Sequence, residues 1–253
     1  MAECAVGDTG VRDDRKSRFV LVVDSNPAER NYTSIILQRF EYSVCTAATV
    51  EEALESMAVA VPALVISDAA LQEKSGLDLL GTMRQREGLK DIPLIFLSSF
   101  TDPGMEEQCH FAGCADYLRK PVTAQELYRA VQLVLEPVPR KSIRIAAYLK
   151  ADIGGTPAGI AEYASVLSEN GMFVRTSTTR PVGTVLPVSL MIRGKTLQVE
   201  AMVIYSYGFG GYPYKEPGMG LKFESISPAD RAVIGDFIID QIVTGLADPG
   251  KKE

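Results

Sequence analysis

Two kinds of hydrophobic segment alternate along residues 18–137. Short runs that are mostly apolar are separated by longer stretches in which apolar residues recur at helical spacing. Runs of the first kind are typical of strands buried on both faces, and their alternation with helices predicts a parallel sheet. The predicted strands are Phe19–Val23, Tyr42–Cys45, Leu64–Ser67, Leu94–Leu97 and Tyr117–Leu118. The predicted helices span 27–40, 50–59, 76–86, 103–113 and 123–136.

Capping residues support two of these helix starts. Asn26 precedes Pro27, and proline is favoured at the first position of a helix. Thr123 is followed three residues later by Glu126, which is the spacing of a capping box. These signals place helix starts close to residues 27 and 123.

The pattern changes after residue 139. The remainder holds 14 of the 21 glycines, and its apolar segments are separated by glycine and proline turns. This pattern is typical of an antiparallel barrel or sandwich. The strand-like segments are Arg144–Leu149, Met172–Thr176, Thr184–Ile192, Leu197–Tyr207 and Gly220–Phe223. A closing helix is predicted after Ser227, a capping residue followed by proline, with an apolar stripe of Ile234, Phe237, Ile238 and Ile242.

The two patterns divide the chain into a polar, flexible tail at 1–17, an α/β domain at 18–137 and an all-β domain at 138–253. Apolar residues make up 46% of the chain and charged residues 23%, as in ordinary globular proteins. No apolar run reaches the roughly 18 residues of a membrane span, and the start lacks the apolar core of a signal peptide. We therefore expect a cytoplasmic protein that does not insert into membranes.

Charge and motifs exclude several classes of function. Residues 1–139 carry 13 basic and 21 acidic side chains, the rest carries 13 and 11, and no basic stripe or helix-turn-helix is present, which argues against a DNA partner. There is no Walker-type phosphate loop. The single histidine, His110, completes no Ser-His-Asp set, so we expect no enzyme and name no catalytic residues.

Four polar residues follow predicted strands, and the carboxyl ends of parallel strands share one edge of a sheet. Asp24 follows the first strand, Asp68 the third, Ser98 the fourth and Lys120 the last. Two carboxylates suit a hard divalent cation, whereas a hydroxyl and an ammonium suit a phosphoryl group. A carboxylate beside such a cation can act as a nucleophile and become an acyl phosphate. The simpler alternative, that each residue merely ends a strand, explains one such residue better than four.

This half resembles the receiver domain of bacterial response regulators over about residues 18–137. The segments that carry the resemblance are VLVVDSNPAER, VISDAALQEKSGLDLL, PLIFLSS and ADYLRKPVT. It implies a doubly wound, five-stranded parallel sheet and transfer of a phosphoryl group from a histidine kinase. The residues it assigns are Asp68 as phosphoacceptor, Asp24, Asp68 and the backbone carbonyl of Ala70 at Mg²⁺, Ser98 and Lys120 as supports of the phosphoryl group, and Tyr117 as the aromatic that rotates.

Two positions depart from the receiver pattern. Ser25 stands where a second acid usually follows the first strand, and Gln72 stands where proline is usual, four residues after the acceptor. Loss of a carboxylate about 4 Å from a divalent ion removes roughly 2–8 kcal/mol of Coulomb attraction, part of which returns as avoided desolvation. We therefore expect a weakened magnesium site.

Arg140 and Arg144 lie four residues apart at the start of the second half. In an extended segment both would point to one side, roughly 13 Å apart. A guanidinium can bond a phosphate, or the O6 and N7 atoms of guanine, through two parallel hydrogen bonds. Taken alone, the pair fits a solvated basic linker better than a ligand site.

The surrounding segments resemble the PilZ domain over about residues 139–243. They are RKSIR, residues 166–176, residues 181–184 and residues 218–223. The resemblance implies a six-stranded antiparallel barrel with a C-terminal helix, whose usual ligand is cyclic di-GMP. Its ligand-binding residues in this chain would be Arg140, Arg144, Ser168 and Gly171.

Val166 departs from the PilZ pattern, which has Asp or Asn at this position. Losing a hydrogen bond to a charged group costs about 1.5–3 kcal/mol, or roughly 10- to 150-fold in affinity. Glu169, Asn170 or Arg175 could compensate, and the sequence leaves this open.

Two functions remain. The first is a response regulator whose phosphorylation on Asp68 is coupled to a PilZ effector that binds cyclic di-GMP or a downstream protein. The second is an adaptor in which both small-molecule sites have degenerated, as Ser25, Gln72 and Val166 suggest. The aromatic-rich segment 205–214, with five aromatic residues, would be the adaptor's contact surface or merely a loop that covers the barrel end.

Overall fold

The computed structural model describes residues 18–99, 103–140, 142–154, 162–208 and 216–244. Two predicted features lie outside these ranges: the tail at 1–17, and residues 209–214 of the aromatic-rich segment 205–214. The chain forms two units, and the division between them falls after Pro139.

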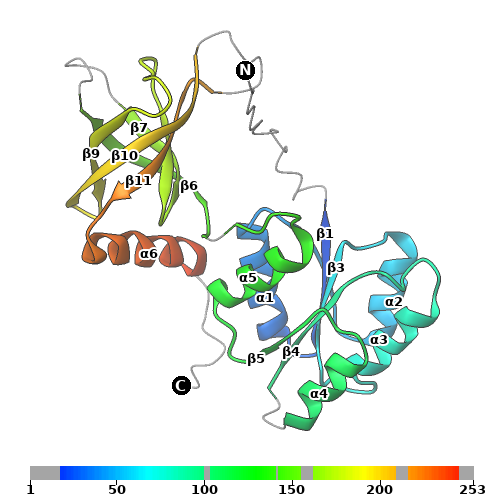
Figure 1. Ribbon diagram of the computed structural model, residues 1–253. Coiled ribbons are helices and arrows are strands. Elements are labelled where there is room, and N and C mark those ends of the chain that lie inside the picture. The colour runs from blue at the N-terminus through cyan, green and yellow to red at the C-terminus, as the bar shows by residue number, and fades with distance from the viewer. Residues whose placement is uncertain (1–17, 100–102, 141, 155–161, 209–215, 245–253) are drawn as a thin grey trace. The chain divides into compact units, whose positions relative to one another are not determined.

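The first unit is a five-stranded parallel sheet with the strand order β2-β1-β3-β4-β5. Helices α1 and α5 cover one face, and α2, α3 and α4 cover the other (Figure 1). The strands are β1 (Phe19–Val23), β2 (Ser43–Ala47), β3 (Leu64–Asp68), β4 (Leu94–Ser98) and β5 (Asp116–Arg119). The helices are α1 (Pro27–Arg39), α2 (Val50–Val59), α3 (Gly76–Gln85), α4 (Pro103–Phe111) and α5 (Ala124–Leu135).

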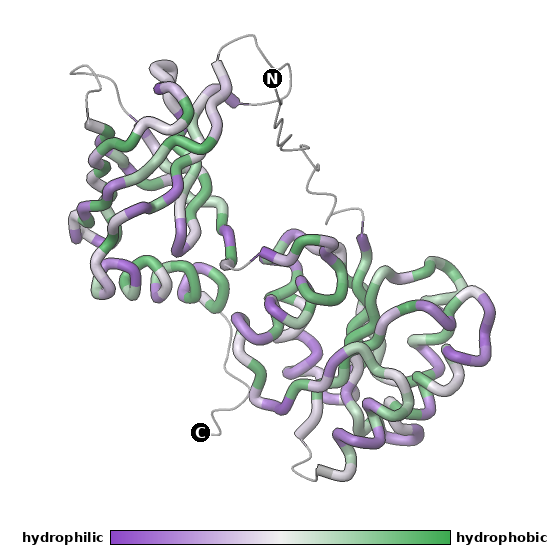
Figure 2. Tube along the Cα trace, in the orientation of Figure 1, coloured by the Kyte–Doolittle hydropathy of each residue, from purple (hydrophilic) through white to green (hydrophobic). Residues whose placement is uncertain are grey.

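Burial explains why the apolar runs became the central strands. Four of the five residues of β1, four of β3 and all five of β4 are buried, so polar residues would be costly on either face. Figure 2 shows these strands as mostly hydrophobic. The edge strand β2 is more exposed, which explains its weaker sequence pattern. All five strands and five helices of this unit were predicted, with small shifts at their ends.

The predicted helix caps are confirmed. The Asn26 side chain accepts a hydrogen bond from the Ala28 amide at 2.9 Å. Thr123 and Glu126 form a reciprocal capping box at the start of α5. The first cap has a functional consequence, because it starts α1 directly beyond the carboxyl end of β1.

The second unit is a closed, six-stranded antiparallel barrel followed by a helix, with the strand order β10-β11-β8-β7-β6-β9. The strands are β6 (Ile145–Ile153), β7 (Glu162–Ser168), β8 (Gly171–Arg175), β9 (Val185–Ile192), β10 (Lys195–Tyr207) and β11 (Gly218–Ser225). Helix α6 spans Pro228–Val243 and is capped by Ser227. It buries Ile234, Ile238 and Ile242, three residues of the predicted stripe.

Strand β7 is the one barrel strand that the hydrophobic pattern did not predict. It begins with a glutamate, Glu162, which is only 2% exposed. Its pairing with β8 also shifts between Ala164 and Val166, which interrupts the alternation of inward and outward side chains. A buried acid and a bulge together hide a strand from a test based on period-two hydrophobicity.

None of the described helices is long and apolar enough to cross a membrane.

Candidate functional site

Asp24 and Asp68 meet at the carboxyl edge of the parallel sheet. Asp24 directly follows β1, and Asp68 is the last residue of its neighbour β3. The chain order reverses at this point of the sheet, and ligands of doubly wound sheets gather at such points. Asp24 is 3% exposed, so its carboxylate needs partners.

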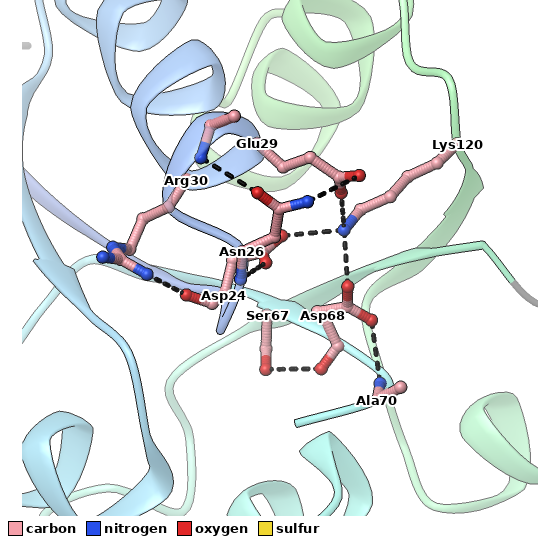
Figure 3. A network of polar contacts seen from close by, with 9 residues as sticks. Asp24, Asn26, Glu29, Arg30, Ser67, Asp68, Ala70 and Lys120 are labelled. Carbon is pink, nitrogen blue, oxygen red and sulfur yellow. Dashed lines mark hydrogen bonds and ion pairs between the residues drawn. The ribbon is translucent and has the colours of Figure 1, made fainter. Parts of the chain in front are cut away.

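Lys120 supplies those partners, as Figure 3 shows. Its Nζ donates to Asp24 Oδ2 at 2.7 Å and also to Asp68 Oδ2. It forms a third ion pair with Glu29, from the first turn of α1. The Lys120 side chain is 10% exposed, so one largely buried ammonium holds three carboxylates together. We call Asp24, Glu29, Asp68 and Lys120 the carboxylate corner.

Backbone amides bind the outer oxygens of both aspartates. Asp24 Oδ1 accepts from the Asn26 amide and Asp68 Oδ1 from the Ala70 amide, each at 2.8 Å. Gly76 leaves no space for a side chain beside Asp68, because a Cβ there would lie 2.3 Å from the Asp68 carbonyl oxygen. These contacts fix the direction in which each carboxylate points.

Burial and hydrogen bonding act in opposite directions on the pKa values of Asp68 and Lys120. Burial raises the pKa of the Asp68 carboxyl, although hydrogen bonds from Lys120 and the Ala70 amide act to lower it. Burial alone would lower the pKa of Lys120, but its hydrogen bonds to Asp24, Asp68 and Glu29 outweigh burial and raise it. At neutral pH Lys120 is therefore a cation.

Glu29 is the corner residue that the sequence did not reveal. One carboxylate oxygen from each of Asp24, Glu29 and Asp68 lies within 4.8 Å of the others, close enough to share a cation. Its position five residues after Asp24, in the first turn of a capped helix, is the signal that could have identified it.

The other predicted phosphoryl-site residues lie on the neighbouring strands β4 and β5. Ser98 is fully buried at the end of β4, and its carbonyl accepts from the Lys120 amide at 2.8 Å. Tyr117 pairs in register with Phe96 and is 7% exposed. Within the described part of the chain, its hydroxyl has no hydrogen-bond partner. Of the two departures, Ser25 is half-buried and Gln72 is exposed.

A groove of about 810 Å³ lies on the barrel and is lined by all four residues predicted to bind a dinucleotide. These are Arg140, Arg144, Ser168 and Gly171, and Val166 lines the same groove. The volume lies within the usual range for small-molecule sites. Arg144 is exposed and has no hydrogen bond or ion pair with any described residue. Its guanidinium is therefore available to an anion.

Family models match both units. A model described as "Response regulator receiver domain" matches residues 20–132, and one described as "PilZ domain" matches residues 139–240. The two-component response regulator ORR3 of Oryza sativa subsp. indica is 31% identical over 117 residues, which cover 46% of this chain and 89% of that protein. The protein belongs to the response regulator receiver family. Its receiver domain is followed by a PilZ domain.

Other relatives also match less than half of this chain. An uncharacterised 14.6 kDa protein from the sodA1 3′ region of Leptolyngbya boryana is 33% identical over 113 residues, covering 45% of this chain and 86% of that protein. Among solved structures, the chemotaxis protein CheY4 of Vibrio cholerae is 30% identical, with a TM-score of 0.45, covering 47% of this chain and 98% of that chain.

Two signature residues of the PilZ domain have structural roles that need no ligand. Ser168 Oγ donates to the Gly171 carbonyl at 3.0 Å and so closes the turn between β7 and β8. A Cβ on Gly171 would lie 2.3 Å from the Leu221 carbonyl oxygen, so only glycine fits beside β11. The Ser168 oxygen can still accept a hydrogen bond, whereas its proton is engaged in the turn.

The three residues considered as compensation for Val166 have different surroundings. The Asn170 amide donates to Ser142 Oγ at 3.3 Å, and its Oδ1 accepts from Arg231 at 2.8 Å. Arg175 lines the groove but is paired with Glu216. Glu169 is not among the residues that line the groove and lies close to Gly235 of α6. Asn170 and Arg175 are thus engaged with other residues, and Glu169 lies outside the groove lining, so none of the three replaces the missing Asp or Asn there.

Proposed function

We propose that this response regulator accepts a phosphoryl group from a histidine kinase on Asp68 and passes the signal to a PilZ domain that binds cyclic di-GMP. The carboxylate corner is the observation that carries the first half of the proposal. It combines a nucleophile, two further carboxylates and a buried cation at the sheet edge where ligands gather.

The transfer step takes place between Asp68 and the donor, with Lys120, Ser98 and a bound divalent cation as supports. A carboxylate oxygen of Asp68 attacks phosphorus, and an O–P bond forms while the N–P bond of the donor phosphohistidine breaks. The electron pair of the broken bond returns to the imidazole nitrogen. Lys120 and Ser98 would then bind the oxygens of the transferred phosphoryl group. The negative charge of this group would take the place of the Asp68 carboxylate charge, which Lys120 contacts before the transfer.

The corner fits a magnesium ion by its donor set. Carboxylate oxygens are the ligands that Mg²⁺ prefers, and three converge here within 4.8 Å. When bound, the ion would neutralise charge on the phosphoryl oxygens. Asp24, Asp68 and Glu29 would hold the ion. Glu29 would then supply the carboxylate that is missing at position 25, where this chain has Ser25. Because Lys120 already occupies these oxygens, the ion has to compete with an internal ammonium.

Mass analysis of the intact chain tests whether Asp68 accepts a phosphoryl group. With an acyl phosphate donor and Mg²⁺, we expect one added phosphoryl group, and none in Asp68→Asn. Asp91→Asn, which changes an exposed aspartate outside the corner, is the matched control and keeps the modification. Equal modification of the wild type and Asp68→Asn would place the phosphoryl group elsewhere, and no modification of either would reject phosphoacceptance.

The groove carries the second half of the proposal. Arg140 and Arg144 would bind the phosphates of cyclic di-GMP, and Ser168 would accept from the ligand beside the close approach at Gly171. Titration calorimetry on the wild type and Arg144→Ala tests this. We expect binding in the wild type and a loss of at least tenfold in the variant, whereas no heat in either contradicts the proposal.

An adaptor function is the second candidate. It is favoured by Val166 and by the structural reasons for Ser168 and Gly171, since both residues would remain in a barrel that had lost its ligand. An adaptor would show neither phosphorylation of Asp68 nor heat with the dinucleotide. Those two measurements therefore decide between the candidates.

A further inference from the structure

A row of side chains crosses the outer face of the barrel along the floor of the groove. Val166 of β7 is the register partner of Phe173 on β8, Phe173 of Gly220 on β11, and Gly220 of Tyr205 on β10. All four residues line the groove. The position where the family has Asp or Asn is therefore one end of an apolar and aromatic row.

The two glycines of β11 on this face are covered by aromatic rings. A Cβ on Gly220 would lie 2.3 Å from the Tyr205 ring, and one on Gly218 would lie 2.7 Å from the Phe173 ring. The Phe173 and Tyr205 rings have centroids 6.2 Å apart and planes 21° apart, and Tyr207 adds a third ring 5.3 Å from Tyr205. All three aromatic residues are half-buried, and all three line the groove.

Cations surround this aromatic floor, whereas acids are scarce. Arg140, Arg144, Arg175 and Lys222 line the groove, and Glu216 is the single carboxylate among the described lining residues. Glu216 is paired with Arg175. The groove thus offers charge for phosphates and ring faces for bases, but no unpaired carboxylate for a base edge.

We propose that the groove binds cyclic dinucleotides by stacking a purine base on Tyr205 and Phe173, and that it does not distinguish guanine from adenine. This rests on the proposed ligand-binding function of the groove and extends it to cyclic di-AMP. Stacking is tolerant of base identity because every base has a π-face. Arginines that hold phosphates carry no base information either.

The chemistry of the base edges explains the lost selectivity. Guanine presents two adjacent donors, N1–H and N2–H₂, which match a carboxylate. Adenine presents one donor beside the acceptor N1, which a carboxylate repels. Asp at position 166 would therefore favour guanine, and Val166 favours neither base.

Calorimetric titration of the full chain with cyclic di-GMP and cyclic di-AMP tests the proposal. We expect both to bind, with dissociation constants within about tenfold of each other. Cyclic di-GMP binding more than a hundredfold tighter would overturn the proposal and leave the proposed function intact. No binding of either nucleotide would overturn both.

Three variants test the role of the ring. Tyr205→Leu should weaken both nucleotides about tenfold or more, the usual effect of losing a stacking partner. Tyr205→Phe keeps the ring and should keep the affinity, which separates stacking from a folding defect. Tyr148→Leu changes an exposed tyrosine that stacks on Tyr163 and does not line the groove. This variant should leave the affinities for both nucleotides unchanged. Equal affinities for Tyr205→Leu and Tyr148→Leu would overturn the stacking.

Val166→Asp tests the selectivity from the opposite direction. We expect cyclic di-GMP to bind about tenfold tighter and cyclic di-AMP to stay equal or weaken. A parallel gain for both nucleotides would show that this position does not read the base, and would overturn that part of the proposal.

Discussion

Lys120 offsets part of the negative charge of the carboxylate corner from within the chain. Three carboxylates around one site repel one another, and a buried cation among them lowers that repulsion without any metal. Such a buried cluster is sensitive to the loss of one partner, because the remaining charges are left uncompensated. The corner therefore depends on Lys120, and a divalent cation that entered it would have to compete with this ammonium.

Removing Lys120 should destabilise the receiver domain in a pH-dependent way. For Lys120→Met we expect a loss of about 3 kcal/mol in the free energy of unfolding at pH 7. Because the folded state raises the pKa of Lys120, its charge stabilises the folded state fully at any pH below the ordinary pKa of lysine. The wild type therefore has this stabilisation throughout the neutral range. In the variant the Asp68 pKa rises further, because the cation beside it is gone. The folded state then binds more protons than the unfolded state, so the loss of unfolding free energy becomes smaller as the pH falls towards 5.

Chemical unfolding at pH 7 and pH 5 measures this effect. Lys74→Met is the control, since Lys74 forms an exposed pair with Glu51 and its removal should change little at either pH. A loss for Lys120→Met that is the same at both pH values would argue against a charge-based role.

Glu29 should contribute to the affinity for the divalent cation. We expect Glu29→Gln to weaken Mg²⁺ binding by about tenfold, because a ligand charge is lost while the shape is kept. Glu126→Gln, a capping-box residue outside the corner, leaves the metal affinity unchanged. Magnesium titration followed by the rise in melting temperature is the measurement, and equal affinity for Glu29→Gln and wild type would remove Glu29 from the ligand set.

The sequence could place most of the corner but not all of it. Asp24, Asp68 and Lys120 were predictable because strand ends of a parallel sheet share an edge. Glu29 was missed, because its place in the first turn of a capped helix was the only signal, and that signal does not say in which direction the side chain points. The engagement of Ser168 with its own turn was equally invisible, since a motif gives residue types and not hydrogen-bond partners.

At the scale of elements, the tight hairpin between β7 and β8 decides how the groove is built. The turn brings Ser168 opposite Gly171, and Gly171 in turn lies against β11. Strands with clear hydrophobic runs were predictable, whereas β7 was hidden by a buried acid and a register shift. The family resemblance supplied the sixth strand that hydrophobicity alone missed.

Gly171→Ala should destabilise the barrel even without ligand. The added Cβ would overlap the Leu221 carbonyl oxygen, and forcing atoms into a packed site costs about 1–3 kcal/mol. Gly208→Ala is the matched control, because a Cβ there meets no atom within 4 Å. If thermal unfolding shows the two variants to be equally stable, Gly171 is not required by the barrel, and a ligand would have to explain it.

At the scale of the whole molecule, the chain joins two candidate sites of different composition. The corner consists of carboxylates and a buried ammonium at a sheet edge, and the groove is lined by guanidinium groups and aromatic rings on a barrel. Arg140 follows Leu135, the end of α5, by only five residues. A change in the last receiver helix would therefore act close in sequence to the first arginine of the groove. The order of the domains was predictable from the change in hydrophobic pattern at residue 139.

The most direct test of this account is the affinity for cyclic di-GMP in the two states of the receiver domain. Calorimetry on the full chain, with and without Mg²⁺ and beryllofluoride as a phosphoryl mimic, should give dissociation constants that differ by at least about threefold, a coupling of roughly 0.7 kcal/mol. In Asp68→Asn the difference should vanish. Measurable binding with the same affinity in both states would contradict coupling, and no binding in either state would contradict the account as a whole.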